Sequence, residues 1–120
     1  MKRNVAMVGS NVSVKEAAEK MRTANVGILP VGEHNQLVGM LSDRDITVRA
    51  TAEGRDPART TVREIMSDRV YYCFEEQDIA DAATIMMDRN IRRLIVLNQK
   101  KQLVGICSLS DLLEQYPRKA

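Results

Sequence analysis

An internal repeat is the feature of this 120-residue chain that most limits the folds it can adopt. When the sequence is shifted by 65 residues, a series of apolar and asparagine positions in one half coincides with a series in the other. The matched pairs are Val14 and Ile79, Ala17 and Ala82, Ala18 and Ala83, Met21 and Met86, Asn25 and Asn90, Leu29 and Leu94, and Val31 and Val96. After one inserted residue the shift becomes 66, and Gln36–Gly39 coincides with Gln102–Gly105. We therefore expect two similarly folded halves, residues 1–56 and 57–120, that together form one module.

Each half carries the hydrophobic pattern of the same elements in the same order. Apolar residues three and four positions apart predict amphipathic helices that begin near Val14 and Ile79, with Ser13 and Asp78 as N-caps. Two short apolar runs separated by polar residues follow each helix and predict two strands joined by a turn. The expected strands are Gly27–Val31, Leu37–Leu41, Arg93–Leu97 and Leu103–Cys107, with Val5–Val8 and Val70–Phe74 ahead of the helices.

Closing helices are expected to open at Ser42 and Ser108, so the element order is β-α-β-β-α, twice. The fold class is therefore α/β (α+β), in tandem repeats. Half of this chain is too small to be stable alone, so we expect the halves to pack through the apolar faces of their sheets with pseudo-two-fold symmetry.

The connection between the halves carries stop and start signals for helices. Gly54 can end the preceding helix, and Pro57 prevents its continuation. Thr61 and Glu64 have the spacing of a capping box, which predicts a short helical turn. Because the 65-residue shift aligns Met66 with Met1, the first half is expected to lack a counterpart of this lead-in turn.

Composition and charge exclude several functions. The chain has 18 Lys and Arg against 16 Asp and Glu, scattered along its length, and only one Phe, three Tyr and no Trp. Nucleic-acid binding is not expected, because there is neither a basic stripe nor a set of aromatic side chains on which bases could stack. No apolar run is long enough for a membrane span or a secretory signal, which favours the cytoplasm.

Cysteine and histidine usage gives the same picture of a small intracellular module. Cys73 and Cys107 lie in separate apolar runs and are expected to be free thiols in a reducing compartment. His34 is the only histidine, so neither a structural zinc site nor a catalytic set that needs a histidine is expected.

Several segments resemble the CBS domain. In the second half they are Val62–Ser67, Asn90–Val96 and Gly105–Leu112, and in the first half Asn25–Val31 and Leu37–Ile46. Together the halves look like a CBS-domain pair, or Bateman module, that covers essentially the whole chain. The stretch from Ser42 to Met66 is similar to small bacterial stand-alone proteins of this kind.

The resemblance implies a cytoplasmic sensor that is regulatory rather than catalytic and is often paired into a disc-shaped homodimer. Such modules bind adenosine-containing ligands, namely AMP, ADP, ATP, S-adenosylmethionine or sometimes NAD, in clefts between the two repeats. We expect no effector domain in this chain and therefore expect the regulated protein to be another chain.

A Ser-x-x-Asp pattern follows the last strand of each half, at Ser42 to Asp45 and at Ser108 to Asp111. A carboxylate one turn into a helix can accept hydrogen bonds from both hydroxyls of a ribose, and a serine hydroxyl at the helix start can donate to a phosphate. In the family, the aspartate holds the ribose and the hydroxyl lies near phosphate. The same four letters also describe a simple capping box, which would stabilise any helix.

The phosphate end of the ligand requires cations, and here the halves differ. The second half has Arg92 and Arg93 ahead of its strand, where basic residues of related nucleotide sensors reach phosphate. Ser110 is a further candidate in that half, and Arg44 is an alternative cation in the first half. Each of these side chains is equally consistent with a solvated surface position.

The adenine is expected to lie between aliphatic walls because the chain has so few aromatic residues. Candidates are Ile106 and Pro30, and both also suit a place in the core. An enzyme is not supported, because the chain has no P-loop and no nucleophile–histidine set. The remaining alternative is a CBS pair without ligand that serves as a dimerisation or protein-interaction module.

Overall fold

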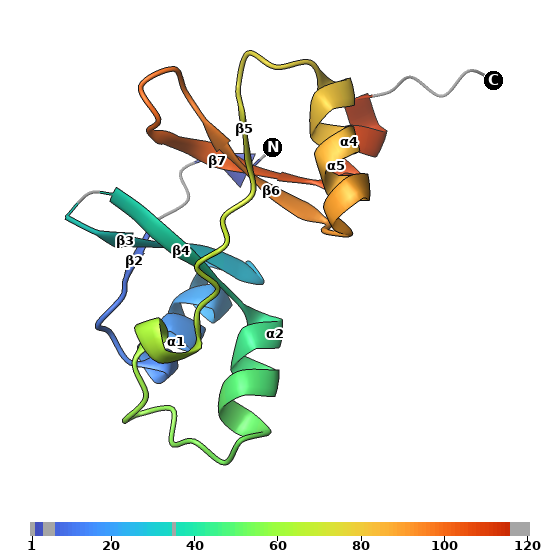
Figure 1. The fold of residues 1–120 in the computed structure, drawn as a ribbon. Helices are drawn as coiled ribbons and strands as arrows, with labels where there is room; N and C mark the ends of the chain where they lie inside the picture. The colour runs from blue at the N-terminus through green and yellow to red at the C-terminus, as the bar shows by residue number, and fades with distance from the viewer. Residues whose placement is uncertain (1, 4–6, 35, 116–120) are drawn as a thin grey trace. The chain divides into compact units, whose positions relative to one another are not determined.

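The computed structural model describes residues 2–3, 7–34 and 36–115 of the chain (Figure 1). They divide into two compact units, an N-terminal unit of residues 6–70 and a C-terminal unit of residues 71–120 to which residues 1–5 also belong. The packing therefore changes from one unit to the other at residue 70, whereas the repeat in the sequence begins again at residue 57. The connecting segment, which carries the short helix α3 (Val62–Ile65), packs with the first unit.

The N-terminal unit is a three-stranded sheet with helices. Its elements are β2 (Val8–Gly9), α1 (Val14–Ala24), β3 (Ile28–Glu33), β4 (Gln36–Ser42), α2 (Asp43–Asp45), the π-helix η1 (Ile46–Thr51) and α3 (Val62–Ile65). The strand order is β2-β3-β4, with β2 parallel and β4 antiparallel to β3.

The C-terminal unit repeats this plan with one additional edge strand. Its elements are β1 (Lys2–Arg3), β5 (Tyr72–Phe74), α4 (Ile79–Arg89), β6 (Arg93–Leu97), β7 (Leu103–Ser108) and α5 (Leu109–Gln115). The strand order is β1-β7-β6-β5, in which β5 is parallel to β6 while β1 and β6 are antiparallel to β7.

The two long helices begin where the sequence predicts. In α1 the hydroxyl of Ser13 accepts a hydrogen bond from the amide of Glu16 at 3.1 Å, and Asp78 occupies the N-cap of α4. Both helices end at an asparagine, Asn25 or Asn90, in the left-handed conformation that closes a helix. The predicted apolar stripes are buried, as shown by Val14, Ala17 and Met21 in α1 and by Ala82 and Met86 in α4.

The predicted fold class and element order are confirmed. The strand predicted at Arg93–Leu97 has those bounds in the structure. Of the other hairpin strands, β4 is one residue longer at each end, β7 is one residue longer at its end, and β3 begins one residue later and ends two residues later than predicted. Half of the strand predicted at Val5–Val8 lies outside the described residues, and β2 begins at its last residue. The π-helix was not predicted.

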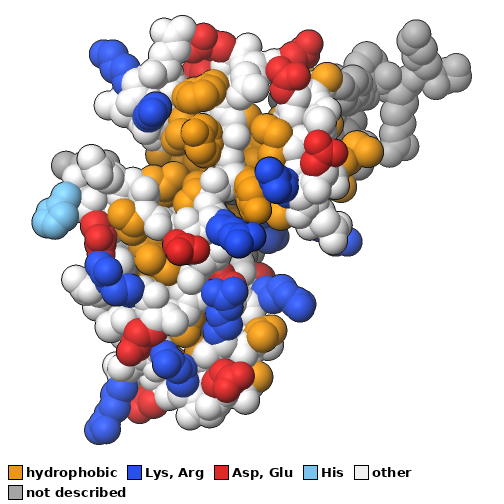
Figure 2. All heavy atoms as spheres, viewed as in Figure 1, with side chains coloured by type: hydrophobic (Ala, Val, Ile, Leu, Met, Phe, Trp, Pro, Cys, Tyr) orange, Lys and Arg blue, Asp and Glu red, His pale blue; other side chains and the backbone are white. Residues whose placement is uncertain are grey.

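In Figure 2, hydrophobic side chains gather over the sheet of the C-terminal unit, and charged side chains cover much of the visible face of the N-terminal unit.

The repeat extends to the short segments that join each sheet edge. In the N-terminal unit Ser67 forms an antiparallel bridge with Met40 of β4, with hydrogen bonds of 2.8 and 2.9 Å. In the C-terminal unit Lys2 of β1 is the register partner of Ile106 of β7. Lys2 and Ile106 are the counterparts of Ser67 and Met40 under the repeat. The two units therefore share one structural plan down to this edge pairing.

Candidate functional site

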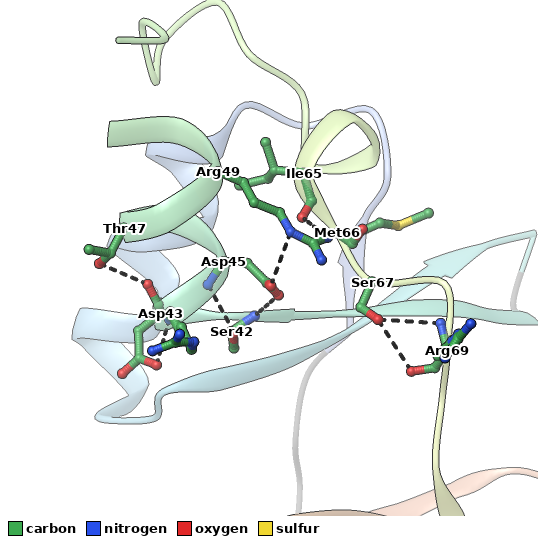
Figure 3. Close-up of polar contacts among 10 residues, drawn as sticks. Ser42, Asp43, Asp45, Thr47, Arg49, Ile65, Met66, Ser67 and Arg69 are labelled. Atoms are coloured by element: carbon green, nitrogen blue, oxygen red, sulfur yellow. Dashed lines mark hydrogen bonds and ion pairs between the residues drawn. The ribbon is translucent and has the colours of Figure 1, made fainter. Parts of the chain in front are cut away.

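The first Ser-x-x-Asp segment joins β4 to α2 and forms a complete capping box (Figure 3). The amide of Asp45 donates to the hydroxyl of Ser42 at 3.0 Å, and the amide of Ser42 donates to a carboxylate oxygen of Asp45 at 2.8 Å. Both residues are half-buried, and the Asp45 side chain is 17% exposed. The predicted pair is thus brought together at the end of a strand, where one edge of the carboxylate still reaches solvent.

The second segment joins β7 to α5 and has the same geometry. The amide of Asp111 donates to the hydroxyl of Ser108 at 3.1 Å, and the amide of Ser108 donates to the Asp111 carboxylate at 2.9 Å. Partial burial raises the pKa of Asp111, whereas hydrogen bonds from the amide and hydroxyl of Ser108 are among the interactions that lower it. The net pKa lies below its usual value. The carboxylate is therefore held in its ionised, acceptor-only form.

The capping interpretation of these segments is confirmed, and it leaves room for a ligand. An ionised carboxylate has two oxygens with about four lone-pair positions. The capping bond to Asp45 uses one oxygen, Oδ2, while the other, Oδ1, lies 4.0 Å from the guanidinium of Arg49. A ribose hydroxyl could therefore donate to the carboxylate without breaking the cap.

The structure brings Arg93 beside Ser108. The two residues are register partners on β6 and β7, and the carbonyl oxygen of Arg92 accepts a hydrogen bond of 2.8 Å from the amide of Leu109 at the start of α5. Both arginine side chains are exposed. The backbone of the C-terminal unit thus brings two arginine residues beside Ser108, where the sequence predicts the phosphate ligands.

The corresponding positions of the N-terminal unit carry no charge. Ile28 is the register partner of Ser42, and the carbonyl oxygen of Gly27 accepts the hydrogen bond of 2.9 Å from the amide of Asp43. The backbone arrangement is the same in both units, and only the side chains differ.

The other two predicted phosphate ligands point to the surface. Arg44 is exposed, and its amide donates to the Asp43 carboxylate at 2.9 Å. Ser110 is exposed within the first turn of α5. Within the described part of the chain neither side chain forms a hydrogen bond or an ion pair, so both would have to be ordered by the ligand.

The two candidates for the adenine wall lie within the sheets. Pro30 on β3 is opposite Met40, and Ile106 on β7 is opposite Ile95. Both are buried, but neither belongs to the apolar cluster beneath the helices of its unit. Since side chains alternate along a strand, they lie on the sheet face that points away from the helices.

Arg49 is a residue of this region that sequence reasoning did not find. From η1 it reaches α3, where one guanidinium nitrogen donates to the carbonyl oxygens of Ile65 and Met66, each at 3.2 Å (Figure 3). The same side chain lies 4.0 Å from Asp45. Arg49 therefore links the first candidate carboxylate to the segment that leads into the C-terminal unit.

The structure gives a steric reason for glycine at position 39 of β4. A Cβ atom at this position would lie 2.7 Å from the carbonyl oxygen of Ser67 and 2.9 Å from the sulfur of Met66. The chain itself therefore makes the close approach at Gly39.

Other kinds of site receive no support from the described residues. Residues 2–3, 7–34 and 36–115 contain no cluster of three or more His, Cys, Asp or Glu side chains that could hold a metal ion. Within the same ranges no helix is long and apolar enough to cross a membrane. Cys73 and Cys107 are both free thiols, the first buried and the second half-buried.

Sequence comparison identifies the family. The profile of the CBS domain matches residues 1–50 and 62–118. The CBS domain-containing protein YhcV of Bacillus subtilis is 44% identical over 112 residues, which cover 93% of this chain and 79% of that protein. L-aspartate semialdehyde sulfurtransferase of Methanocaldococcus jannaschii is 33% identical over 104 residues, but these cover only 19% of that protein.

Solved structures agree with the sequence comparison. A protein with CBS domains from Burkholderia ambifaria superposes with a TM-score of 0.88 at 26% identity, over 99% of this chain and 88% of that one. The hexameric CBS-CP12 protein from bloom-forming cyanobacteria superposes with a TM-score of 0.86 at 28% identity, over 99% of this chain and 69% of that one. The chain described here belongs to the CBS-domain family, with one matched region in each half.

Proposed function

We propose that the chain is a regulatory module that binds an adenosine-containing ligand and passes the signal to a partner chain. AMP, ADP and ATP are the first candidates, and S-adenosylmethionine is the next. One observation carries the proposal. In this chain of the CBS-domain family, Arg93 is the register partner of Ser108, and Ser108 precedes an ionised Asp111 by one helical turn.

The chemistry assigns a role to each residue of the C-terminal unit. Asp111 would accept hydrogen bonds from the ribose hydroxyls through its ionised carboxylate. Arg93 and Arg92 would neutralise the phosphates, with Ser108 and Ser110 as hydroxyl donors. Ile106 would provide part of the apolar wall for the adenine.

A second site in the N-terminal unit would use the corresponding residues. Asp45 would bind the ribose, Ser42 and Arg44 the phosphate, and Pro30 would contact the adenine. This site is expected to be the weaker, because Gly27 and Ile28 stand where the C-terminal unit has its arginine pair. Regulation would follow from differential affinity, since a ligand shifts only an equilibrium between states that it binds unequally.

Thermal unfolding in the presence of ligands tests the proposal. A ligand at 100 times its dissociation constant stabilises the folded state by about 2.7 kcal/mol, which is several degrees for a chain of this size. We expect a shift with at least one of AMP, ATP, S-adenosylmethionine and NAD, and none with inorganic phosphate at the same concentration. Absence of a shift with all four adenosine compounds would contradict the proposal.

A matched variant separates ligand binding from folding. Asp111→Asn keeps an oxygen that can accept the hydrogen bond from the Ser108 amide, so the cap is largely retained, but it removes the ionised carboxylate. We expect this variant to fold and to lose most of the ligand-induced shift. If Asp45→Asn abolishes the shift instead, the ligand binds to the N-terminal unit.

Self-association without a ligand is the second candidate function. It is favoured by the capping bonds, which already give Ser42, Asp45, Ser108 and Asp111 a structural role, and by the hexameric state named for the CBS-CP12 neighbour. We propose a homodimer that works in the cytoplasm, where both thiols would stay reduced. Equilibrium sedimentation tests this, and a mass that stays monomeric at all concentrations would contradict it.

A further inference from the structure

The C-terminal unit contains a pocket of about 240 Å³ between its sheet and the start of α4. The residues that matter for its shape are Cys73, Gln77, Ile79, Ala82, Cys107 and Leu112. None of the candidate ligand residues described above lines it. Because the chain contains two copies of this unit, the corresponding place in the N-terminal unit shows what such a pocket accommodates.

In the N-terminal unit that place is covered by α3. Val62 and Ile65 of α3 are 0% and 1% exposed and belong to the apolar cluster of that unit. The counterparts of Cys73 and Cys107 are Val8 and Leu41, which are 4% and 0% exposed. The larger side chains and α3 together fill the space that is open in the C-terminal unit.

The backbone of α3 and the preceding residues is fixed by four hydrogen bonds to the turn that opens α1. The amides of Val62 and Arg63 donate to the carbonyl oxygens of Val12 and Ser10, at 2.9 and 2.8 Å. In return, the amides of Val14 and Lys15 donate to the carbonyl oxygens of Thr60 and Pro57, at 2.8 and 3.0 Å. Two donors and two acceptors at the start of α1 thus hold the covering segment.

The same four backbone groups exist in the C-terminal unit. Under the 65-residue shift they are the carbonyl oxygens of Gln77 and Glu75 and the amides of Ile79 and Ala80. Within residues 2–3, 7–34 and 36–115, no group bonds to any of the four. The pocket therefore has an apolar floor and a hydrogen-bonding edge, both of which the repeat shows to be suited to a short helical segment.

The charge at the edge indicates which segment would bind. Glu75, Glu76 and Asp78 are exposed at the turn, where the N-terminal unit has the neutral residues Ser10, Asn11 and Ser13. In α3 the guanidinium of Arg63 forms an ion pair with Glu33 and donates to the hydroxyl of Ser10 at 3.4 Å. A cation at the same place on a segment bound to the C-terminal unit would face the carboxylate of Glu75.

We propose that this pocket is a docking site for a short basic helical turn of a partner protein. The segment would place two apolar side chains, three positions apart as in Val62 and Ile65, over the floor, and a Lys or Arg next to the first of them would pair with Glu75. This site is separate from the proposed adenosine site and does not depend on it.

Binding of a synthetic peptide tests the proposal. The probe is an acetylated and amidated, fluorescently labelled peptide with the sequence of residues 57–67, and fluorescence anisotropy measures its affinity for the whole chain. Replacing the residues at Val62 and Ile65 of the peptide by Ser should weaken binding by at least about tenfold, because the apolar contacts are lost. Glu75→Lys should weaken it by about threefold or more, whereas Glu19→Lys, the same change on α1, should not.

Amide hydrogen exchange locates the bound peptide. In the free chain the amides of Ile79 and Ala80 should exchange faster than those of Val14 and Lys15, and saturating peptide should slow them. Three results would overturn the proposal: protection of Ile79 and Ala80 in the free chain at every concentration, protection that grows with protein concentration, and protection by AMP or ATP. The first result would indicate that the chain itself covers the pocket. The second would indicate a second copy, and the third the adenosine ligand.

Discussion

Replacing Gly39 by alanine should destabilise the N-terminal unit, and the size of the effect can be worked out from the structure. The added Cβ atom would lie 2.7 Å from the Ser67 carbonyl oxygen, a backbone atom that cannot move without breaking the bridge to Met40. Overpacking of this kind costs about 1–3 kcal/mol. The loss of unfolded-state entropy offsets about 0.4–1 kcal/mol of that. The net destabilisation should be about 1–2 kcal/mol.

Gly9→Ala is the matched control, because it makes the same change in the same unit. There the new Cβ atom would meet a side-chain carbon of Val12 at 3.7 Å, an ordinary contact. Its stability should stay within about 0.5 kcal/mol of the parent chain. Urea unfolding followed by circular dichroism measures both variants, and the slope with denaturant should not change. Equal stability of the two variants would refute the argument that residues 66 and 67 fit closely against β4.

Three further predictions concern the capping boxes and Arg49. Because the folded-state pKa of Asp111 is lowered from 3.8, the stability that it contributes is present above that pH and is lost as the pH falls through the folded value. Urea unfolding at several pH values should show that Asp111→Asn loses less stability on acidification than the parent chain. Ser42→Ala should cost about 1 kcal/mol in the same assay, while Ser110→Ala on the surface should cost less than about 0.5 kcal/mol, and equal effects would contradict the capping role. Arg49→Ala should speed amide exchange in α3, and Arg44→Ala should not; identical exchange in the two variants would remove the assigned link between η1 and α3.

The helices and hairpins could be predicted from the sequence because their signals are local. The spacing of Val14, Ala17 and Met21 marks one helix face, and a side-chain cap at Ser13 fixes where the helix begins. The Ser-x-x-Asp segments were found for the same reason, since a capping box spans only four residues. The choice of Arg93 as a phosphate ligand came from the family resemblance, and the hairpin, which allows few registers, makes Arg93 the register partner of Ser108.

The features that were missed depend on contacts between distant parts of the chain. Arg49 has no pattern in the sequence that marks it, because its partners Ile65 and Met66 are brought to it by the course of the connecting segment. The same segment explains Gly39, whose neighbour Ser67 cannot be inferred from a strand pattern. The pocket depends on which segment covers each unit, and this follows from tertiary packing rather than from local propensity.

The pairing of β1 with β7 has a consequence for the order of folding. Lys2 and Ile106 are register partners at opposite ends of the chain, so the N-terminal unit is in effect inserted between a two-residue strand and the rest of its sheet. Closing a flexible loop of this length costs about 4 kcal/mol of chain entropy, more than two residues of ladder return. The pairing should therefore form only after the N-terminal unit has folded and replaced that loop by a compact body. In the native state the β1–β7 pairing should be the first part of the four-stranded sheet to open. Amide exchange in the C-terminal unit should therefore be fastest for the hydrogen bonds between these two strands.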